Sequence, residues 1–239
     1  MTNGRIMSPN DKLLPGWSTI SDAIERMAFL PDQRTGDYLL WSDTLSSLTR
    51  LGIGVAIATL IGGIFGILQG LIPYFRATFN AFTGVLSMIP PLSVLPILFI
   101  IFGLGELAKV MLVVIGIVPF IIRDLALRTA EIPHEEIIKA QTLGASTWQI
   151  ILRIVVPQML PRLIDGVRLS LGAAWLFLIA AEAIASDSGL GYRIFLMRRY
   201  LAMDVILPYV AWITILAFAL DLSLRLFQRI AFRWMYRGN

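Results

Sequence analysis

The chain has 239 residues, of which 57% are hydrophobic and 15% are charged, and its formal net charge is +4. Because a soluble domain carries about 25% charged residues, this composition excludes an ordinary soluble domain and predicts an integral membrane protein. One histidine and no cysteine argue against an imidazole metal site and exclude disulfides and thiol catalysis.

Residues 1–43 are polar and contain no membrane span. The stretch 13–30 comes nearest, but Asp22, Glu25 and Arg26 interrupt it, which favours a short amphipathic helix. The first 40 residues contain no apolar core typical of a signal peptide. We therefore expect a polar N-terminal segment, followed by a membrane domain at 44–224.

Five apolar segments follow, each long enough for the roughly 20 residues with which a helix crosses a bilayer. They lie at about 44–72, 79–102, 106–127, 163–186 and 204–224. Pro90, Pro91 and Pro96 should kink or break the second segment, and Pro119 interrupts the third. Such breaks can line a cavity or serve packing alone, and both interpretations stay open.

The first span carries a small residue at every fourth position. Residues at this spacing share one face of a helix and let another backbone approach closely. We expect this face to serve helix packing and not chemistry; it consists of Gly54, Ala58, Gly62, Gly66 and Gly70.

An acidic residue, Glu182, lies deep in the fourth span. An ionisable group there costs about 3 kcal/mol or more, so it should face the bundle interior or a water-filled cavity. Arg168 shares its helical face but lies about 21 Å along the helix, so Glu182 requires a partner from another helix or a proton. A cavity-lining role and a packing role both stay open. In the last span, Asp221 has the i,i+4 spacing to pair with Arg225.

Basic residues gather in the loop at about 128–162 and in the tail at 225–239. Four arginines of the tail are spaced by four and form one helical face: Arg225, Arg229, Arg233 and Arg237. Because positive charge favours the cytoplasmic side, we expect the loop and the amphipathic tail to be cytoplasmic. With five spans, the N-terminal segment then lies outside.

Motifs for phosphate-cradling loops, zinc proteases and serine nucleophiles are absent from the sequence. We therefore expect no catalytic residue, no metal ligand and no cofactor of its own, and we do not expect an enzyme. If ATP drives this protein, another chain must hydrolyse it.

The loop segment 138–157 resembles the EAA loop of binding-protein-dependent ABC importers, with Gly144 and Pro157 at the family's glycine and proline positions. Four more segments are similar to the nitrate, sulfonate, taurine and bicarbonate branch of these permeases: 88–96, 102–110, 174–182 and 188–192. The resemblance implies an all-α type I importer transmembrane domain in the bacterial cytoplasmic (inner) membrane. It also implies a second permease copy or paralogue, an extracytoplasmic solute-binding protein, and a cytoplasmic ABC ATPase dimer that binds ATP and Mg.

The resemblance also assigns roles to residues. In this family a short coupling helix of the loop inserts into the ATPase. The implied coupling residues are Ala140, Gly144, Ala145, Ser146, Trp148, Gln149 and Pro157. The family's glutamate and the next alanine are replaced by Ile138 and Lys139, and Glu135 or Glu136, one turn earlier, is the candidate substitute. Permeases of this branch usually have a sixth span before residue 13, so this chain is either a five-span variant or has its true start upstream.

We expect the translocation path to involve the proline-rich break and one face of the fourth span. The candidate path residues are Met88, Pro91, Ser93, Trp175, Glu182 and Ser186. The expected function is the permease subunit of an ATP-driven importer for a small anion or zwitterion. Two alternatives remain: a membrane scaffold that does not transport, and an ion-coupled secondary transporter, which would need more intramembrane carboxylates and internal repeats.

Overall fold

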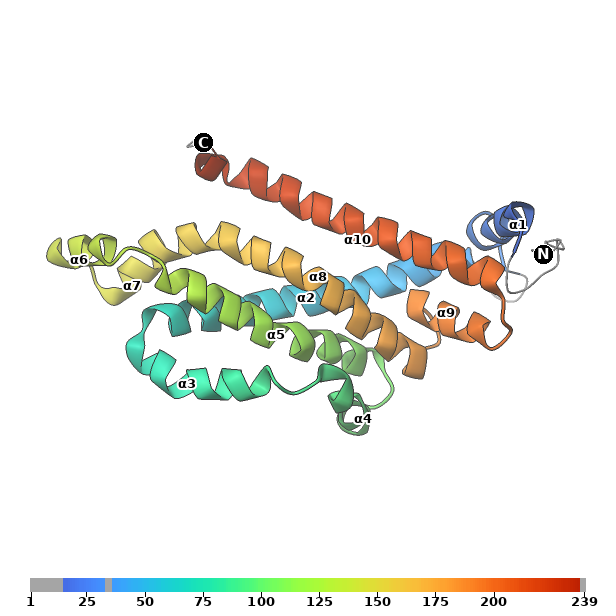
Figure 1. Cartoon of the computed structure of the whole chain (residues 1–239), viewed down its shortest axis with the longest axis horizontal. Coiled ribbons are helices and arrows are strands. Elements are labelled where there is room, and N and C mark those ends of the chain that lie inside the picture. The colour runs from blue at the N-terminus through green and yellow to red at the C-terminus, as the bar shows by residue number, and fades with distance from the viewer. Residues whose placement is uncertain (1–14, 33–35, 237–239) are drawn as a thin grey trace, which may run out of the picture.

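A computed structural model describes residues 15–32 and 36–236, and in these ranges the chain forms helices, turns and no strand (Figure 1). The helices are α1 (Trp17–Ala28), α2 (Leu39–Leu71), α3 (Pro73–Leu86), α4 (Pro91–Phe102), α5 (Glu106–Ala130), α6 (His134–Thr142), α7 (Thr147–Ile150), α8 (Val156–Ala185), α9 (Leu190–Arg198) and α10 (Met203–Ala231). A π-helical turn (Ile151–Val155) joins α7 to α8, and a 3-10 turn (Arg233–Tyr236) follows α10.

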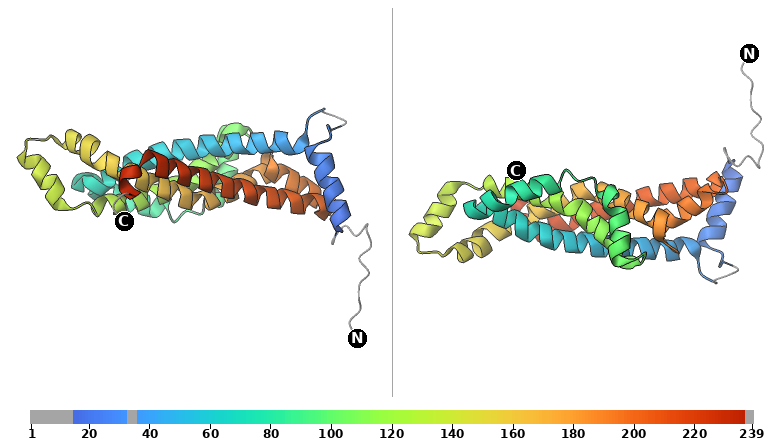
Figure 2. Two further views of the ribbon diagram at one scale, coloured as in Figure 1. Left: turned by 90° about the horizontal axis from the view of Figure 1, so that it is seen from above. Right: turned by 90° about the horizontal axis from the view of Figure 1, so that it is seen from below.

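The long helices α2, α5, α8 and α10 run along the length of the molecule (Figure 1). Helices α6 and α7 project from one end of this bundle, which we call the loop end. Helices α1 and α9 lie at the opposite end, the far end, where α1 runs across the bundle axis (Figure 2). The expected amphipathic helix corresponds to α1, while residues 13 and 14 lie outside the described ranges.

Within the described ranges, four helical stretches are long and apolar enough to cross a membrane: Leu39–Leu71, Glu106–Ala130, Thr147–Ala185 and Met203–Ala231. Helices α3 and α4 make a fifth only if they count as one span bent by 92°. The expected break of the segment 79–102 is therefore present, and its first helix starts earlier than expected, at Pro73. The chain breaks between Leu86 and Pro91, where Pro90 is extended and Pro91 starts a new helix, the first-turn position that proline tolerates best.

The fourth span is longer than the expected 163–186, because its helix begins at Thr147. Arg153 and Arg162 made this stretch look like a loop. Its apolar residues instead form a second core at the loop end, with Ile150, Ile151 and Val155 buried against Leu125. The expected separate tail is likewise partly helical, since α10 continues through Arg225 and Arg229 to Ala231, while Arg237 lies outside the described ranges.

The small-residue face of α2 lies against α5, and all five of its members are buried. A Cβ added to Gly62 would lie 2.5 Å from Cγ2 of Ile121, and one added to Gly70 would lie 2.4 Å from Cβ of Thr129. No side chain larger than hydrogen fits at these positions without movement. The glycines therefore set the distance between α2 and α5, and α8 packs on the α5 side of this pair.

Candidate functional site

The turn after α6 depends on Gly144, whose φ of +82° lies in the left-handed region. The Gly144 N–H donates to the Gln141 carbonyl (2.9 Å), and the Ala145 N–H donates to the Ala140 carbonyl (3.0 Å). These two bonds make a Schellman motif, which ends a helix on a left-handed residue, usually glycine. The glycine therefore reverses the chain at the tip of the loop end.

Helix α7 starts at once after this turn and is capped by its own side chains. The Gln149 N–H donates to Oγ of Ser146 (3.4 Å), and the Ser146 N–H donates to Oε1 of Gln149 (2.9 Å). This capping box satisfies two backbone donors that a helix start leaves free. Ser146 and Gln149, expected to contact an ATPase, thus have a local role in fixing the direction of α7, although both remain exposed.

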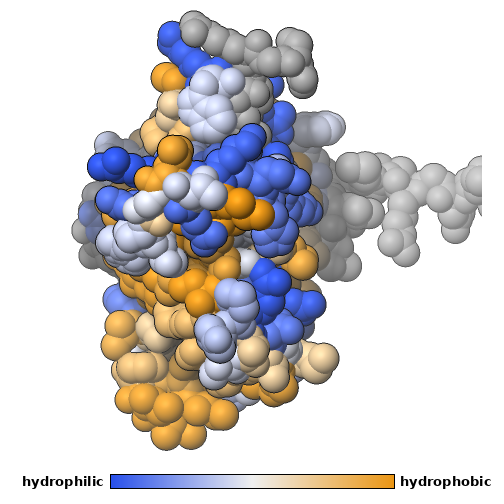
Figure 3. Space-filling view, turned by 90° about the vertical axis from the view of Figure 1, so that its left-hand side faces the viewer, coloured by the Kyte–Doolittle hydropathy of each residue, from blue (hydrophilic) through white to orange (hydrophobic). Residues whose placement is uncertain are grey.

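Large apolar side chains are exposed on this fixed turn. Leu143 is 88% exposed and Trp148 is 63% exposed, while Ala145 is half-buried against the second core. Pro157 is exposed in the first turn of α8. Figure 3 faces this end and shows hydrophilic surface interspersed with hydrophobic residues.

The positions that depart from the EAA pattern lie on α6. Ile138 and Lys139 are both exposed there. Of the two candidate substitutes for the missing glutamate, Glu136 accepts a hydrogen bond from Nε2 of Gln158 (2.9 Å), which ties α6 to α8. This bond links the two helices on either side of the turn, and it supports the turn in addition to the Schellman motif and the capping box.

Glu182 is 0% exposed and finds its partner on another helix, but it lies in the last turn of α8 and not deep in the span as expected. Its Oε1 lies 2.7 Å from Nη1 of Arg50 on α2. The Ser47 hydroxyl and the Gly191 N–H also donate to the carboxylate, at 2.8 Å and 2.9 Å. These donors satisfy the carboxylate, and Glu182 is not among the residues that line the cavity beside the α3–α4 break described below. Sequence reasoning passed over Arg50, yet an arginine inside an apolar span was itself a signal that an acid lies opposite.

The far end holds further ion pairs around Glu182. Arg50 also pairs with Glu106 of α5, which accepts from Lys109 Nζ at 2.9 Å. Asp43 of α2 accepts from Nε of Arg193 on α9 at 2.8 Å and from the hydroxyl of Tyr209 on α10 at 3.3 Å. These contacts join five helices, and we call the whole set the Arg50 network: Asp43, Ser47, Arg50, Glu106, Lys109, Glu182, Arg193 and Tyr209.

A separate ion pair ties α8 to α10 midway along the bundle. The expected contact of Asp221 with Arg225 is present at 3.1 Å. Asp221 also accepts from Nε of Arg168 at 2.8 Å, a contact that sequence spacing did not suggest because the two residues are 53 positions apart.

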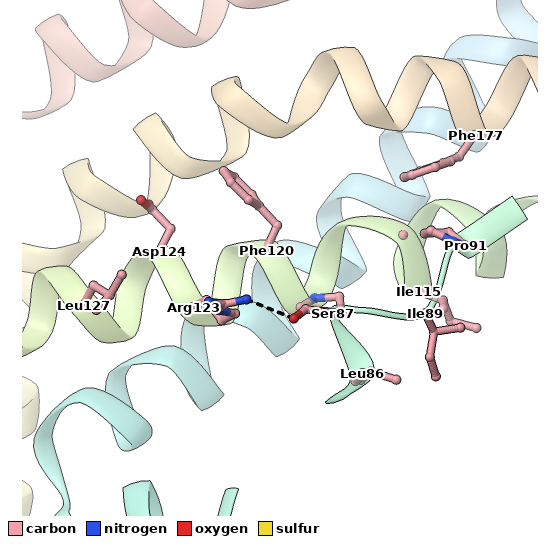
Figure 4. Close-up of a pocket in the computed structure, with 12 residues that line it drawn as sticks. Leu86, Ser87, Ile89, Pro91, Ile115, Phe120, Arg123, Asp124, Leu127 and Phe177 are labelled. Atoms are coloured by element: carbon pink, nitrogen blue, oxygen red, sulfur yellow. Dashed lines mark hydrogen bonds between the residues drawn. The ribbon is translucent and has the colours of Figure 1, made fainter. Parts of the chain in front are cut away.

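A cavity of about 440 Å³ lies between the α3–α4 break, α5 and α8 (Figure 4). Of the six expected path residues, only Pro91 lines it. Met88 and Ser93 are exposed beside the same break, Trp175 and Glu182 are buried, and the Ser186 hydroxyl donates to the Ser188 carbonyl in the turn after α8. The structure therefore does not gather the six residues in one place. Among the described residues, no group of His, Cys, Asp and Glu could hold a metal ion.

A bundle of long apolar helices with a partly apolar loop projecting from one end is the architecture of a multi-pass membrane protein. Residues 51–237 match the family described as binding-protein-dependent transport system inner membrane component, and this chain belongs to that family.

The relatives and the structural neighbours agree with this assignment. The chain is 36% identical to the taurine transport system permease protein TauC of Escherichia coli over 83% of this chain and 72% of that protein. It is 32% identical to the bicarbonate transport system permease protein CmpB of Synechococcus elongatus over 84% of this chain and 70% of that protein. An inward-facing structure of the MetNI methionine ABC transporter matches with a TM-score of 0.71 and 22% identity, covering 83% of this chain and 99% of the matched chain. The predicted type I importer fold and the predicted permease class are confirmed.

Proposed function

We propose that this chain is the permease subunit of an ATP-driven importer for a small anionic or zwitterionic solute, such as a sulfonate, taurine, nitrate or bicarbonate. Relatives named for taurine and bicarbonate transport support this solute class. In this proposal a solute-binding protein delivers the solute from outside the bacterial cytoplasmic membrane. A second copy or a paralogue completes the path, and an ABC ATPase dimer binds ATP and Mg.

One observation carries the proposal: an exposed tryptophan stands on a turn whose backbone is fixed from both sides. Tryptophan is among the residues that contribute most to protein interfaces when it enters a pocket on the partner. The Schellman motif at Gly144 and the capping box at Ser146 hold the turn before docking, so little conformational freedom is lost on binding. Trp148 is the proposed anchor on the ATPase, with Leu143 beside it. Ala140, Ala145, Gln149 and Pro157 shape the surface around them.

The path in this proposal runs past the break between α3 and α4. Met88 and Ser93 are exposed there, and Pro91 lines the cavity. Glu182 has a different role: an ionised carboxylate would repel an anion, and this one is enclosed by donors. We assign it to holding the far end together.

The proposal is tested by replacing Trp148 with alanine in the complete complex. Loss of an anchor costs about 2 kcal/mol or more, which weakens ATPase docking about 30-fold. Trp17→Ala is the matched control, because Trp17 is 87% exposed on α1 at the opposite end. Co-purification of the ATPase and ATP hydrolysis stimulated by the solute-binding protein are measured for both variants.

We expect Trp148→Ala to lose both signals and Trp17→Ala to keep ATPase co-purification. Normal co-purification with Trp148→Ala would contradict the docking assignment. The alternative of a membrane scaffold without transport makes a different prediction. It would be favoured if the rate of ATP hydrolysis changed neither on addition of the solute-binding protein nor on removal of this chain.

A further inference from the structure

Arg123 faces a cavity and has no acidic partner among the described residues, unlike Arg50, Arg128 and Arg168. Arg50, Arg128 and Arg168 each contact a carboxylate, at 2.7 Å, 2.8 Å and 2.8 Å respectively. Arg123 lies on α5 within a candidate span, and its side chain is open to the cavity beside the α3–α4 break. A permanent charge at such a position requires water or an ion of opposite charge.

The neighbours of Arg123 leave most of its hydrogen-bonding capacity unused. Its Nη1 donates to Oγ of Ser87 at 3.0 Å (Figure 4). The Ser87 hydroxyl in turn donates to the Gly84 carbonyl at 2.8 Å. This neutral contact holds the guanidinium at the cavity wall without compensating its charge. A guanidinium has five N–H donors in a planar fork, which suits the paired oxygens of a carboxylate or sulfonate.

The net charge of the cavity wall depends on whether Asp124, the acidic residue that lines it, balances Arg123. Asp124 also lines the cavity, but its Oδ2 accepts from Nε of Arg128 at 2.8 Å and is thereby neutralised. In Figure 4 Asp124 extends toward α8, whereas Arg123 extends toward Ser87 on the opposite wall. Most of the remaining lining is apolar: Leu86, Ile89, Ile115, Phe120, Leu127 and Phe177. The cavity therefore presents one uncompensated cation on a largely apolar wall.

We propose that Arg123 binds the oxyanion group of the transported solute, a small sulfonate or carboxylate, while the apolar wall accepts the solute's short carbon chain. This inference rests on the proposed function for the origin of the ligand. It makes Arg123 a specificity-determining residue, since an uncharged solute would leave the guanidinium unpaired inside the membrane.

A lipid phosphate offers the same chemistry as a solute oxyanion. Arg123 also lines a neighbouring cavity of about 240 Å³ with Gln69, Arg76 and Asn80, so a second arginine stands close by. Arg76 donates to the carbonyls of Gln69 and Gly70 at the end of α2 and is thereby partly satisfied. The test must therefore separate solute from lipid, and Arg123 from Arg76.

The chain contains no cysteine, so a single introduced thiol reports on the cavity without further changes. Ser87→Cys places that thiol beside Arg123. Its thiolate attacks the thiosulfonate sulfur of a methanethiosulfonate reagent, forms a mixed disulfide and releases methanesulfinate. Reaction rates are compared for the anionic 2-sulfonatoethyl reagent and the cationic 2-(trimethylammonium)ethyl reagent. Their ratio cancels any change in thiol acidity and leaves the local charge.

We expect the anionic-to-cationic rate ratio at Ser87→Cys to fall by about fivefold or more when Arg123→Gln is added. The matched control Arg76→Gln should change the ratio by less than about twofold, because the more distant charge is screened. Methanesulfonate should slow the anionic reagent when Arg123 is present and have no effect in Arg123→Gln. An unchanged ratio in Arg123→Gln, or no protection by methanesulfonate, would overturn the proposal.

The lipid alternative is tested by repeating the measurement in nanodiscs of phosphatidylcholine, with and without phosphatidylglycerol. Protection by phosphatidylglycerol and not by methanesulfonate would assign Arg123 to a lipid headgroup and overturn the solute site. None of these readouts requires ATPase docking. Failure of the Arg123 site therefore leaves the Trp148 result standing, and failure of docking leaves the Arg123 result interpretable.

Discussion

Replacing Glu182 with glutamine removes one charge from the Arg50 network and keeps the shape of the side chain. In the structure Oε1 accepts from Arg50 (2.7 Å), Oε2 accepts from the Gly191 N–H (2.9 Å), and the Ser47 hydroxyl lies within 3.0 Å of both oxygens. A glutamine amide has only one acceptor oxygen. In either orientation, its NH2 group therefore opposes a donor, the guanidinium or the backbone N–H.

The expected cost follows from these contacts. A buried donor left without an acceptor costs about 1–3 kcal/mol, and hydrogen bonds to a charged group contribute about 1.5–3 kcal/mol. Breaking one side of a buried ion pair costs about 3–5 kcal/mol, and Arg50 retains Glu106 as a second partner, so we expect about 3 kcal/mol. For a chain of this size each kcal/mol lowers the melting temperature by about 2–4 °C, which predicts a loss of about 10 °C.

The assay is thermal unfolding of the purified chain in detergent at one fixed scan rate. Glu25→Gln on the exposed face of α1 is the control and should melt within about 2 °C of the wild type. The double variant Arg50→Gln/Glu182→Gln should lose less than the sum of the two single variants, because the pair interacts directly. If Glu182→Gln melts together with the control, the carboxylate does not hold the far end as an ionised acceptor. Unchanged uptake by this variant would in addition agree with a role of Glu182 outside the path.

Two further substitutions test the packing of α2 and the shape of the loop. Gly62→Ala should destabilise the chain by about 1–3 kcal/mol, because the new Cβ would lie 2.5 Å from the branched side chain of Ile121. Gly52→Ala on the same helix is the control: its new Cβ meets nothing within 4 Å, and it should be neutral in the same melting assay. Equal melting temperatures would mean that α2 and α5 separate easily. A Cβ added by Gly144→Ala also meets nothing within 4 Å, so any effect comes from the backbone φ of +82°. We expect about 1–2 kcal/mol of strain and weaker ATPase co-purification. Full co-purification would show that the turn tolerates another shape.

Sequence reasoning succeeded where the signal is local and repeated along the chain. The small-residue spacing of α2 is a property of one helix, and so is the i,i+4 pair of Asp221 with Arg225. It failed where the answer depends on which helices become neighbours. The partner of Glu182 is 132 positions away in the chain, and Asp221 turns to Arg168 as well as to its local partner.

The boundaries of the helices show a second limit. Hydropathy identifies the part of a helix that lies in lipid, so it placed the start of the fourth span near residue 163. The helix in fact begins at Thr147, because the residues before 163 bury an apolar face against Leu125 and its neighbours while their polar side chains remain outside. The proline-rich break was recognised, but a list of prolines does not give the 92° bend between α3 and α4.

The helical stretch Thr147–Ala185 connects the loop end of the molecule to its far end. At about 1.5 Å per residue, Trp148 lies about 30 Å from Arg168, and Glu182 lies about 21 Å beyond it on the other side. If the helix tilts as a rigid body about the contact of Arg168 with Asp221, its two ends move in opposite directions. Glu182 at the far end then moves about two thirds as far as Trp148 at the loop end. A displacement of Trp148 by a few ångströms would then move Glu182 by a smaller distance in the opposite direction. Because Glu182 belongs to the Arg50 network, this movement would act on all five helices that the network joins.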